Sequence, residues 1–269
     1  MDSGQVAGSL GGACCKNGGL REWRKTGEIA NSPGGRNELT GRERVVCLDA
    51  ETGEEQWVYE YDRPYNLSYA AGPRCTPTVD DGKVYFLGAE GNLVCLTADK
   101  GELVWAKDLA KEYNTTAPIW GFSAHPLVDG DLLYCVVGGE GTIAVAFDKN
   151  TGEEVWRALS GESQGYCPPT MIEYAGKKQL LIWHPLSLNS LDPLSGKVTW
   201  TVPLQPSYEM SIIAPRLAGD KLFASGIGHV GVLLQLDKTG ESVSEVWRGN
   251  TKTALYSAEA TPIIEDGVI

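Results

Sequence analysis

The sequence has little positive charge and no long apolar runs. Its 269 residues carry 23 Lys and Arg against 35 Asp and Glu, which gives a formal net charge of −12. Such an acidic surface repels phosphate backbones, so we expect no nucleic-acid partner. No apolar run approaches the roughly 18–20 residues that cross a bilayer, so we expect no membrane span.

The first twenty residues lack the features of a signal peptide, which are a basic stretch followed by a continuous apolar stretch. Gly12-Ala13-Cys14 is faintly similar to a lipoprotein cleavage site, but no hydrophobic stretch precedes it. We therefore predict no signal peptide in this chain.

Catalytic and metal-binding motifs are also lacking. There is no Gly-x-Ser-x-Gly nucleophile motif and no phosphate-binding Gly-Lys-Ser/Thr loop. The three histidines, His125, His184 and His229, do not lie two to four residues from one another or from a cysteine, so a local zinc site is not expected. We predict no catalytic residue and no metal ligand.

Glycine and aromatic residues are abundant, with 33 Gly, eight Trp and eleven Tyr. That composition is typical of an all-β protein with many tight turns. The seven cysteines are an odd number, so at least one thiol is unpaired within the chain. Cys47 and Cys95 lie in short apolar strands, where they are interpreted as buried small hydrophobic residues.

An internal repeat is the most informative feature of the sequence. Five units place a glycine and then a tryptophan after an acidic turn, with a period of about 44–51 residues. Their anchoring residues are Asp49, Gly53 and Trp57; Gly101 and Trp105, in a copy that begins at Thr97; Asp148, Gly152 and Trp156; Asp192, Gly196 and Trp200; and Asp237, Gly240 and Trp247, in a copy stretched by insertion.

A second element, a proline followed by an apolar strand and an acidic Gly turn, repeats in step with the first and predicts a hairpin. Together they predict four strands per period, roughly 76–80, 83–88, 92–97 and 102–107 in the second copy. We expect the Asp carboxylate to accept backbone N–H bonds in its turn and the Gly to adopt positive φ. The Trp should pack between adjacent units. The predicted fold is an all-β propeller of about five four-stranded antiparallel blades.

The Asp-x-x-Thr-Gly-x-x-x-Trp form, clearest at 47–57 and 146–156, resembles the tryptophan-docking motif of the pyrroloquinoline quinone (PQQ)-type repeat family. This bacterial group includes quinoprotein alcohol dehydrogenases and the non-enzymatic outer-membrane assembly lipoprotein BamB. The resemblance covers about residues 41–269. It implies a ring of seven or eight blades and a full-length protein that is periplasmic or otherwise exported.

The resemblance divides the chain into an irregular segment, 1–40, with at most one or two poorly formed strands, and a propeller domain, 41–269. Because about five blades are counted, we expect a truncated seven- or eight-bladed ring. The alternative is a closed five-bladed ring, in which strands around 44–60 join 261–265 in a shared blade.

Binding residues are expected in the loops that connect one blade to the next, at one mouth of the channel. These loops are 60–75, 108–124, 158–167, 203–213 and 248–260. The candidate ligand-binding residues are Tyr65, Arg74, Trp120, His125, Tyr166 and Tyr208, with Tyr69 and Tyr256 in the same loops. Alternatively, these aromatic side chains only pack the loops onto the blades.

The favoured function is a non-enzymatic scaffold that binds a protein, a peptide or a small ligand at this mouth, with no cofactor. The alternative is a PQQ-dependent quinoprotein oxidoreductase, which would need PQQ and calcium. For that alternative the resemblance implies a disulfide between neighbouring cysteines, and Cys14-Cys15 is such a pair. The pair lies outside any blade motif, and the calcium ligands and catalytic Asp of the family match no position. A third possibility is that the open propeller aggregates through an exposed blade face.

Overall fold

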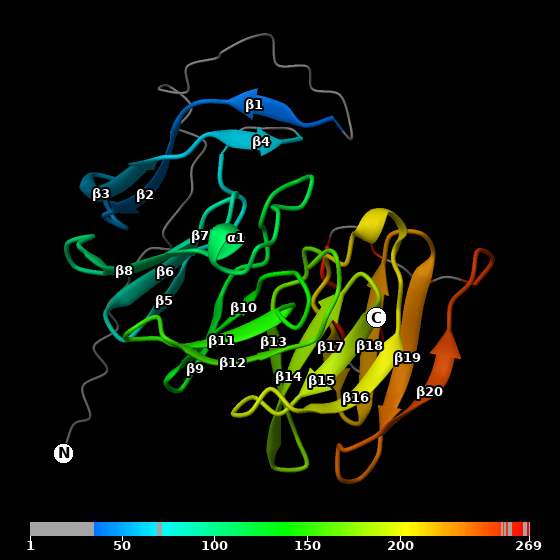
Figure 1. Cartoon of the computed structure of the whole chain (residues 1–269). Coiled ribbons are helices and arrows are strands. Elements are labelled where there is room, and N and C mark those ends of the chain that lie inside the picture. The colour runs from blue at the N-terminus through cyan, green and yellow to red at the C-terminus, as the bar shows by residue number, and fades with distance from the viewer. Residues whose placement is uncertain are drawn as a thin grey trace, which may run out of the picture.

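The computed structural model describes residues 35–68, 72–253, 255, 257, 260–265 and 268, which form an almost entirely antiparallel β structure (Figure 1). The candidate residues Cys14, Cys15, Tyr69 and Tyr256 lie outside the described residues, as does most of the segment expected to be irregular.

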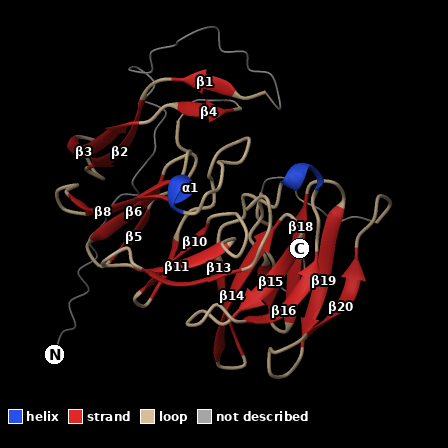
Figure 2. Ribbon diagram, viewed as in Figure 1, coloured by secondary structure: helices blue, strands red, loops and turns tan. Residues whose placement is uncertain are grey.

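Four sheets have four strands each, and they follow one another along the chain (Figure 2). Blade II contains β5 (Thr78–Asp80), β6 (Lys83–Leu87), β7 (Asn92–Thr97) and β8 (Leu103–Asp108). Blade III contains β9 (Leu127–Asp129), β10 (Leu132–Val136), β11 (Ala144–Asp148) and β12 (Glu154–Ala158). Blade IV contains β13 (Thr170–Tyr174), β14 (Lys177–His184), β15 (Ser187–Leu191) and β16 (Val198–Pro203). Blade V contains β17 (Arg216–Ala218), β18 (Lys221–Gly226), β19 (Val230–Leu236) and β20 (Val243–Arg248).

A fifth unit, half-blade I, has two strands within the described residues, β2 (Arg42–Leu48) and β3 (Glu55–Asp62). The expected all-β fold with four-stranded antiparallel blades is confirmed, as a partial propeller. The alternative of a closed five-bladed ring is wrong for the described part of the chain. There, residues 261–265 add no strand to the β2–β3 sheet and make only the isolated bridge Glu265–Val268.

The connections between strands divide the propeller into two faces. Because the four strands of a blade run antiparallel, the loop to the next blade and the turn between the second and third strands emerge on one face, here called the mouth face. The remaining hairpin turns, including the acidic repeat turns, emerge on the opposite face, here called the turn face. The mouth face also carries β1 (Asn37–Leu39), β4 (Tyr65–Leu67), α1 (Leu109–Glu112) and the 3-10 helix η2 (Ser207–Glu209).

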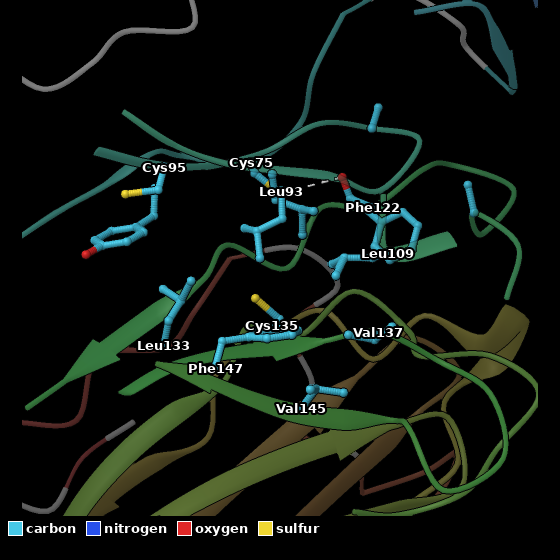
Figure 3. Close-up of a cluster of buried hydrophobic side chains, with 14 of the residues drawn as sticks. Cys75, Leu93, Cys95, Leu109, Phe122, Leu133, Cys135, Val137, Val145 and Phe147 are labelled. Carbon is cyan, nitrogen blue, oxygen red and sulfur yellow. Dashed lines mark hydrogen bonds between the residues drawn. The ribbon is translucent and has the colours of Figure 1, made fainter. Parts of the chain in front are cut away.

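Adjacent blades pack through apolar side chains that alternate along their middle strands. Between blades II and III, Leu93 and Cys95 of β7 face Leu133, Cys135 and Phe147 of β10 and β11, and all five are completely buried (Figure 3). Burial raises the pKa of the Cys95 thiol to about 11, so this thiol is protonated and behaves as a small apolar group. The expectation that Cys95 is a buried core residue agrees with this packing. Cys47, for which the same was expected, is only half-buried.

The repeat turns have the predicted geometry. Asp49 Oδ1 accepts the backbone N–H groups of Glu51 and Thr52 at 3.0 and 2.8 Å, and Gly53 has φ of +73°. These bonds, chiefly that from Thr52, hold the pKa of Asp49 below its ordinary value. Asp148 and Asp192 accept equivalent bonds in the later copies.

The first three repeat tryptophans dock on the repeat glycine of the next blade. A Cβ placed at Gly101 would lie 2.4 Å from the ring of Trp57, and one placed at Gly152 would lie 2.9 Å from the ring of Trp105. The indole Nε1 of Trp57 donates to Ala98 O at 3.0 Å, and that of Trp105 donates to Lys149 O at 3.1 Å. The same arrangement links Trp156 to Gly196 and to Pro193 O. Glycine is required there because any side chain would occupy the space of the ring.

The junction between blades IV and V departs from this rule and corrects the expectation for Trp200 and Gly240. The fifth repeat has one residue fewer between Asp237 and Gly240, and Gly240 contacts Gln179 and Tyr174 instead of a tryptophan. Gln179 Nε2 donates to Gly240 O at 2.9 Å. Trp200 is buried, but its Nε1 has no hydrogen-bond partner among the described residues.

Candidate functional site

The mouth face is built on a buried carboxyl group, Glu43, which was not singled out from the sequence. Glu43 lies on β2 and is completely buried. It accepts hydrogen bonds from the hydroxyls of Tyr61 and Tyr65 and, at 2.8 Å, from the backbone N–H of Ala89. Three donors supply the partners that a buried carboxyl group requires. The only sequence signal was that Glu43 shares the inward-facing alternation of Val45 on the same strand.

Tyr65 is therefore a buried support of the mouth face, with 2% of its surface exposed. Burial raises the pKa of both Tyr61 and Tyr65 well above the ordinary value, and the Glu43 carboxyl group adds to the shift. Both hydroxyls remain protonated donors at physiological pH. The residue that was expected to contact ligand thus fixes the start of the loop between half-blade I and blade II.

Arg74 lies at the other end of the same loop and is half-buried. Its guanidinium donates to Ser68 O at 3.0 Å and to Gly72 O at 3.2 Å. Burial lowers its pKa, and this effect is opposed by the phenol groups of Tyr65 and Tyr166. The cation therefore lies close to two of the other candidate residues.

Trp120 and Tyr166 come from consecutive inter-blade loops and their rings meet at the mouth face. The ring centroids are 5.8 Å apart and tilted by 55°, in the range of favourable aromatic contacts. Trp120 is half-buried, whereas Tyr166 is 8% exposed and burial raises its pKa to about 12. Because Trp120 is the more exposed of the two, it is the member of this pair that a ligand can reach.

Tyr208 is the most exposed candidate residue, with 77% of its surface accessible. It has φ of +59° and Glu209 has φ of +60°, a conformation that bulky residues rarely adopt. Two backbone bonds hold the segment, from Ser207 N to Ile227 O at 2.9 Å and from Ser211 N to Glu209 O at 3.0 Å. Strained backbone of this kind clusters at functional sites. Tyr166 N also donates to Ser211 O at 2.8 Å, so the Trp120–Tyr166 pair and the Tyr208 loop are joined.

His125 lies two residues before β9, at the entrance to the inner strand of blade III. It is half-buried, and burial lowers its pKa. The carbonyl of the next residue, Pro126, accepts a hydrogen bond from Thr78 Oγ1 of blade II. His125 therefore lies where the inner strands of blades II and III adjoin. Arg74, Trp120 and Tyr166 form a separate group, in which Tyr166 contacts Trp120 and affects the pKa of Arg74.

His184 is a further titratable group beneath the mouth face, only 3% exposed. Its Nε2 lies 3.1 Å from Ser187 Oγ, and its Nδ1 has no hydrogen-bond partner among the described residues. Burial lowers its pKa, which means that the folded chain disfavours the protonated ring.

We expect His184 to make stability depend on pH. A histidine with a lowered pKa in the folded state stabilises the fold above its unfolded pKa of about 6.5, and this contribution is lost as pH falls through the folded pKa. The midpoint of urea unfolding should therefore fall between pH 7 and pH 5, and less steeply in His184→Gln. His229→Gln, in the exposed turn before β19, is the matched control. An equal pH slope in wild type and His184→Gln would contradict this assignment.

A separate cavity of about 840 Å³ opens on the turn face, around the repeat turn of blade IV. Lys177 and Lys178 line it and are paired with Glu241 and Asp129 at 2.7 and 2.6 Å. Its charges are thus largely neutralised within the chain. It contains none of the six candidate residues, and we place the candidate site at the mouth face, where the cation and aromatic groups converge.

Neither a metal site nor a membrane span emerges from the described part of the chain. Within it, no three His, Cys, Asp or Glu side chains gather closely enough to hold a metal ion. None of its helices has the length and apolar character needed to cross a membrane.

Known structures share this fold. BamB from Moraxella catarrhalis superposes with a TM-score of 0.56 at 20% identity, over 81% of this chain and 62% of that one. A europium-containing methanol dehydrogenase gives 0.54 at 13% identity, over 84% and 53%. Quinohemoprotein alcohol dehydrogenase from Comamonas testosteroni gives 0.54 at 17% identity, over 82% and 43%. The chain therefore spans less than two thirds of each of these proteins, and the likeness concerns the fold alone.

Comparison with curated proteins finds no match. The sequence of residues 39–269 does match a family described as outer membrane protein assembly factor BamB. This range includes half-blade I, all four complete blades and every one of the repeat motifs. The chain therefore belongs to the BamB family of PQQ-type β-propeller repeat proteins.

Proposed function

We propose that the chain is a non-enzymatic scaffold that binds a protein or peptide at its mouth face. The observation that carries the proposal is a set of aromatic side chains on consecutive inter-blade loops. Trp120 contacts Tyr166, a backbone bond joins Tyr166 to Ser211 beside the Tyr208 loop, and Tyr208 is held outward by strained backbone. Accessible aromatic residues beside a cation are the usual anchors of protein interfaces. The family description supports a protein partner and an exported location for the full-length protein.

The oxidoreductase alternative has less support from the described residues. PQQ chemistry of the dehydrogenase type would require a calcium ion, and calcium is bound by six to eight oxygen ligands that include carboxylates. In the part of the chain that the structure describes, no three His, Cys, Asp or Glu side chains gather into a metal-binding group. The buried Glu43 is instead fully engaged by Tyr61, Tyr65 and Ala89. These residues do not fit the cofactor with its calcium, and we derive no step through it.

The proposal predicts that removing the two accessible aromatic groups abolishes peptide binding. Peptides selected by panning a random library on the wild-type chain should bind Trp120→Ala/Tyr208→Ala at least tenfold more weakly in fluorescence anisotropy, because hot-spot aromatic residues contribute about 2 kcal/mol or more each. Leu194→Ala is the control, since Leu194 is 76% exposed in a turn-face loop. Equal affinity for wild type and the aromatic double variant would contradict the proposal. So would selective binding of PQQ with calcium at the mouth face.

A further inference from the structure

Strand β4 lies at the mouth face and belongs to no blade. Among the described residues it pairs with β1 alone, antiparallel, with Asn37, Glu38 and Leu39 opposite Leu67, Asn66 and Tyr65. Figure 1 shows the two strands side by side, apart from the blades. β4 lies within an inter-blade loop, and its partner strand is only three residues long. The edge of such a strand is accessible for the addition of another strand.

The β4 side of this pair is rigid. Tyr65 and Leu67 are buried, with 2% and 0% of their surfaces exposed, and Tyr65 is bonded to Glu43. The next residue, Ser68, donates its backbone N–H to Ile119 O at 2.8 Å. The pairing edge of β4 is thus preorganised by contacts that do not involve β1.

The β1 side is held more lightly. Asn37 is half-exposed and Glu38 is exposed, so neither side chain anchors β1 in a core. The main attachment is Arg36, whose guanidinium donates to Asn66 O at 2.8 Å and to Ala117 O at 2.9 Å. A three-residue ladder supported by the Arg36 side chain is a short pairing that a competing strand can replace.

The carbonyl and carboxylate groups around the β4 edge favour a basic residue in the added strand. Glu90 accepts the backbone N–H of Asn66 at 2.6 Å and is half-buried beside Arg36. The N–H and C=O of Asn66 are therefore occupied by side chains of Glu90 and Arg36. A new strand can pair with β4 only along the side that β1 now occupies, and a basic residue at the position of Arg36 would meet the same carbonyls and carboxylate.

We propose that the β4 edge is a strand-acceptor site for an extended, basic segment of a partner protein, and that β1 occupies this site in the free chain. The proposal rests on the scaffold function and specifies the form of its partner: main-chain pairing supplies affinity and the Arg36 position supplies specificity. Binding then requires displacement of β1, which blocks the β4 edge in the free chain.

The test uses the full chain and a fluorescent peptide with the sequence of residues 35–41. Arg36→Ala/Asn37→Pro should release β1, because it removes the Arg36 side chain and one backbone donor. This variant should bind the peptide at least tenfold more tightly than wild type does, and a peptide with Glu at the position of Arg36 should bind it at least tenfold more weakly. Arg157→Ala, at an exposed arginine of β12 that pairs with Glu154, is the control and should bind as wild type does. Peptide affinity no higher in the release variant than in wild type would overturn the proposal.

A second measurement does not depend on the folding of the release variant. In Asn66→Cys, the introduced thiolate should displace thionitrobenzoate faster from a peptide activated as its mixed disulfide at a cysteine in the position of Glu38 than from one activated at the position of Asn37, because Glu38 is directly opposite Asn66. The wild-type chain gives the background from its own cysteines. Equal rates for the two peptides would overturn the proposed register. If strand pairing fails while Trp120→Ala/Tyr208→Ala still abolishes binding of selected peptides, the scaffold function stands and the strand-acceptor site does not.

Discussion

Trp156→Ala is expected to lower the free energy of unfolding by about 3–5 kcal/mol, as large-to-small substitutions of buried aromatic residues do. Trp156 is 8% exposed and its ring fills the space in which a Cβ at Gly196 would lie, only 2.5 Å from Cε3. Its Nε1 also donates to Pro193 O at 2.9 Å. The substitution removes the main contact that locks blade III to the repeat turn of blade IV. Urea unfolding followed by circular dichroism measures the change.

A matched pair of milder substitutions separates the hydrogen bond from the packing. Trp156→Phe loses a bonded N–H and should cost about 1 kcal/mol more than Trp200→Phe. Trp200 is equally buried, but its N–H has no partner among the described residues, because the shortened fifth repeat does not present the acceptor. An equal or larger loss in Trp200→Phe would show that the junction between blades IV and V is closed as the others are.

Glu43→Leu is expected to cost about 3 kcal/mol or more. It leaves the hydroxyls of Tyr61 and Tyr65 and the N–H of Ala89 without their acceptor, and each unsatisfied buried group costs about 1–3 kcal/mol. The variant should also loosen β4, since Tyr65 is one of its two buried side chains. Urea unfolding reports the first effect and amide hydrogen exchange of residues 65–67 the second.

Glu60→Leu is the control for this substitution. Glu60 lies on β3 and pairs with Arg42 at 2.8 Å, but 38% of its side chain is exposed. An exposed ion pair contributes less than about 1 kcal/mol, so the control should remain close to wild type in stability. Similar losses in Glu43→Leu and Glu60→Leu would refute the assignment of Glu43 as the centre of the mouth face.

The blades could be predicted from sequence because their determinants are local. Asp49 and Gly53 shape one turn within five residues, and the next repeat supplies the glycine on which Trp57 docks. The strand boundaries followed because most hairpins have their own Gly turn, although the turn between β14 and β15 is Pro185-Leu186. The one failure, at Trp200 and Gly240, arose from a single missing residue, which shifts the acceptor carbonyl and allows Gln179 to replace the ring.

The candidate site was less predictable because it depends on contacts between distant segments. Tyr65 and Tyr208 are both tyrosines in inter-blade loops, yet one is 2% and the other 77% exposed. What separates them is Glu43, a charged residue that is bonded to Tyr61 on β3 and to Ala89 in the turn between β6 and β7. Arg36 likewise reaches the mouth face from a segment with no repeat motif.

The most direct test of the account is amide hydrogen exchange of the full chain with and without a selected peptide. The account predicts slower exchange in the loops around Trp120, Tyr166 and Tyr208 and in residues 65–67, with no change in the repeat turns of blades III to V. Protection confined to the repeat turns on the turn face would contradict it.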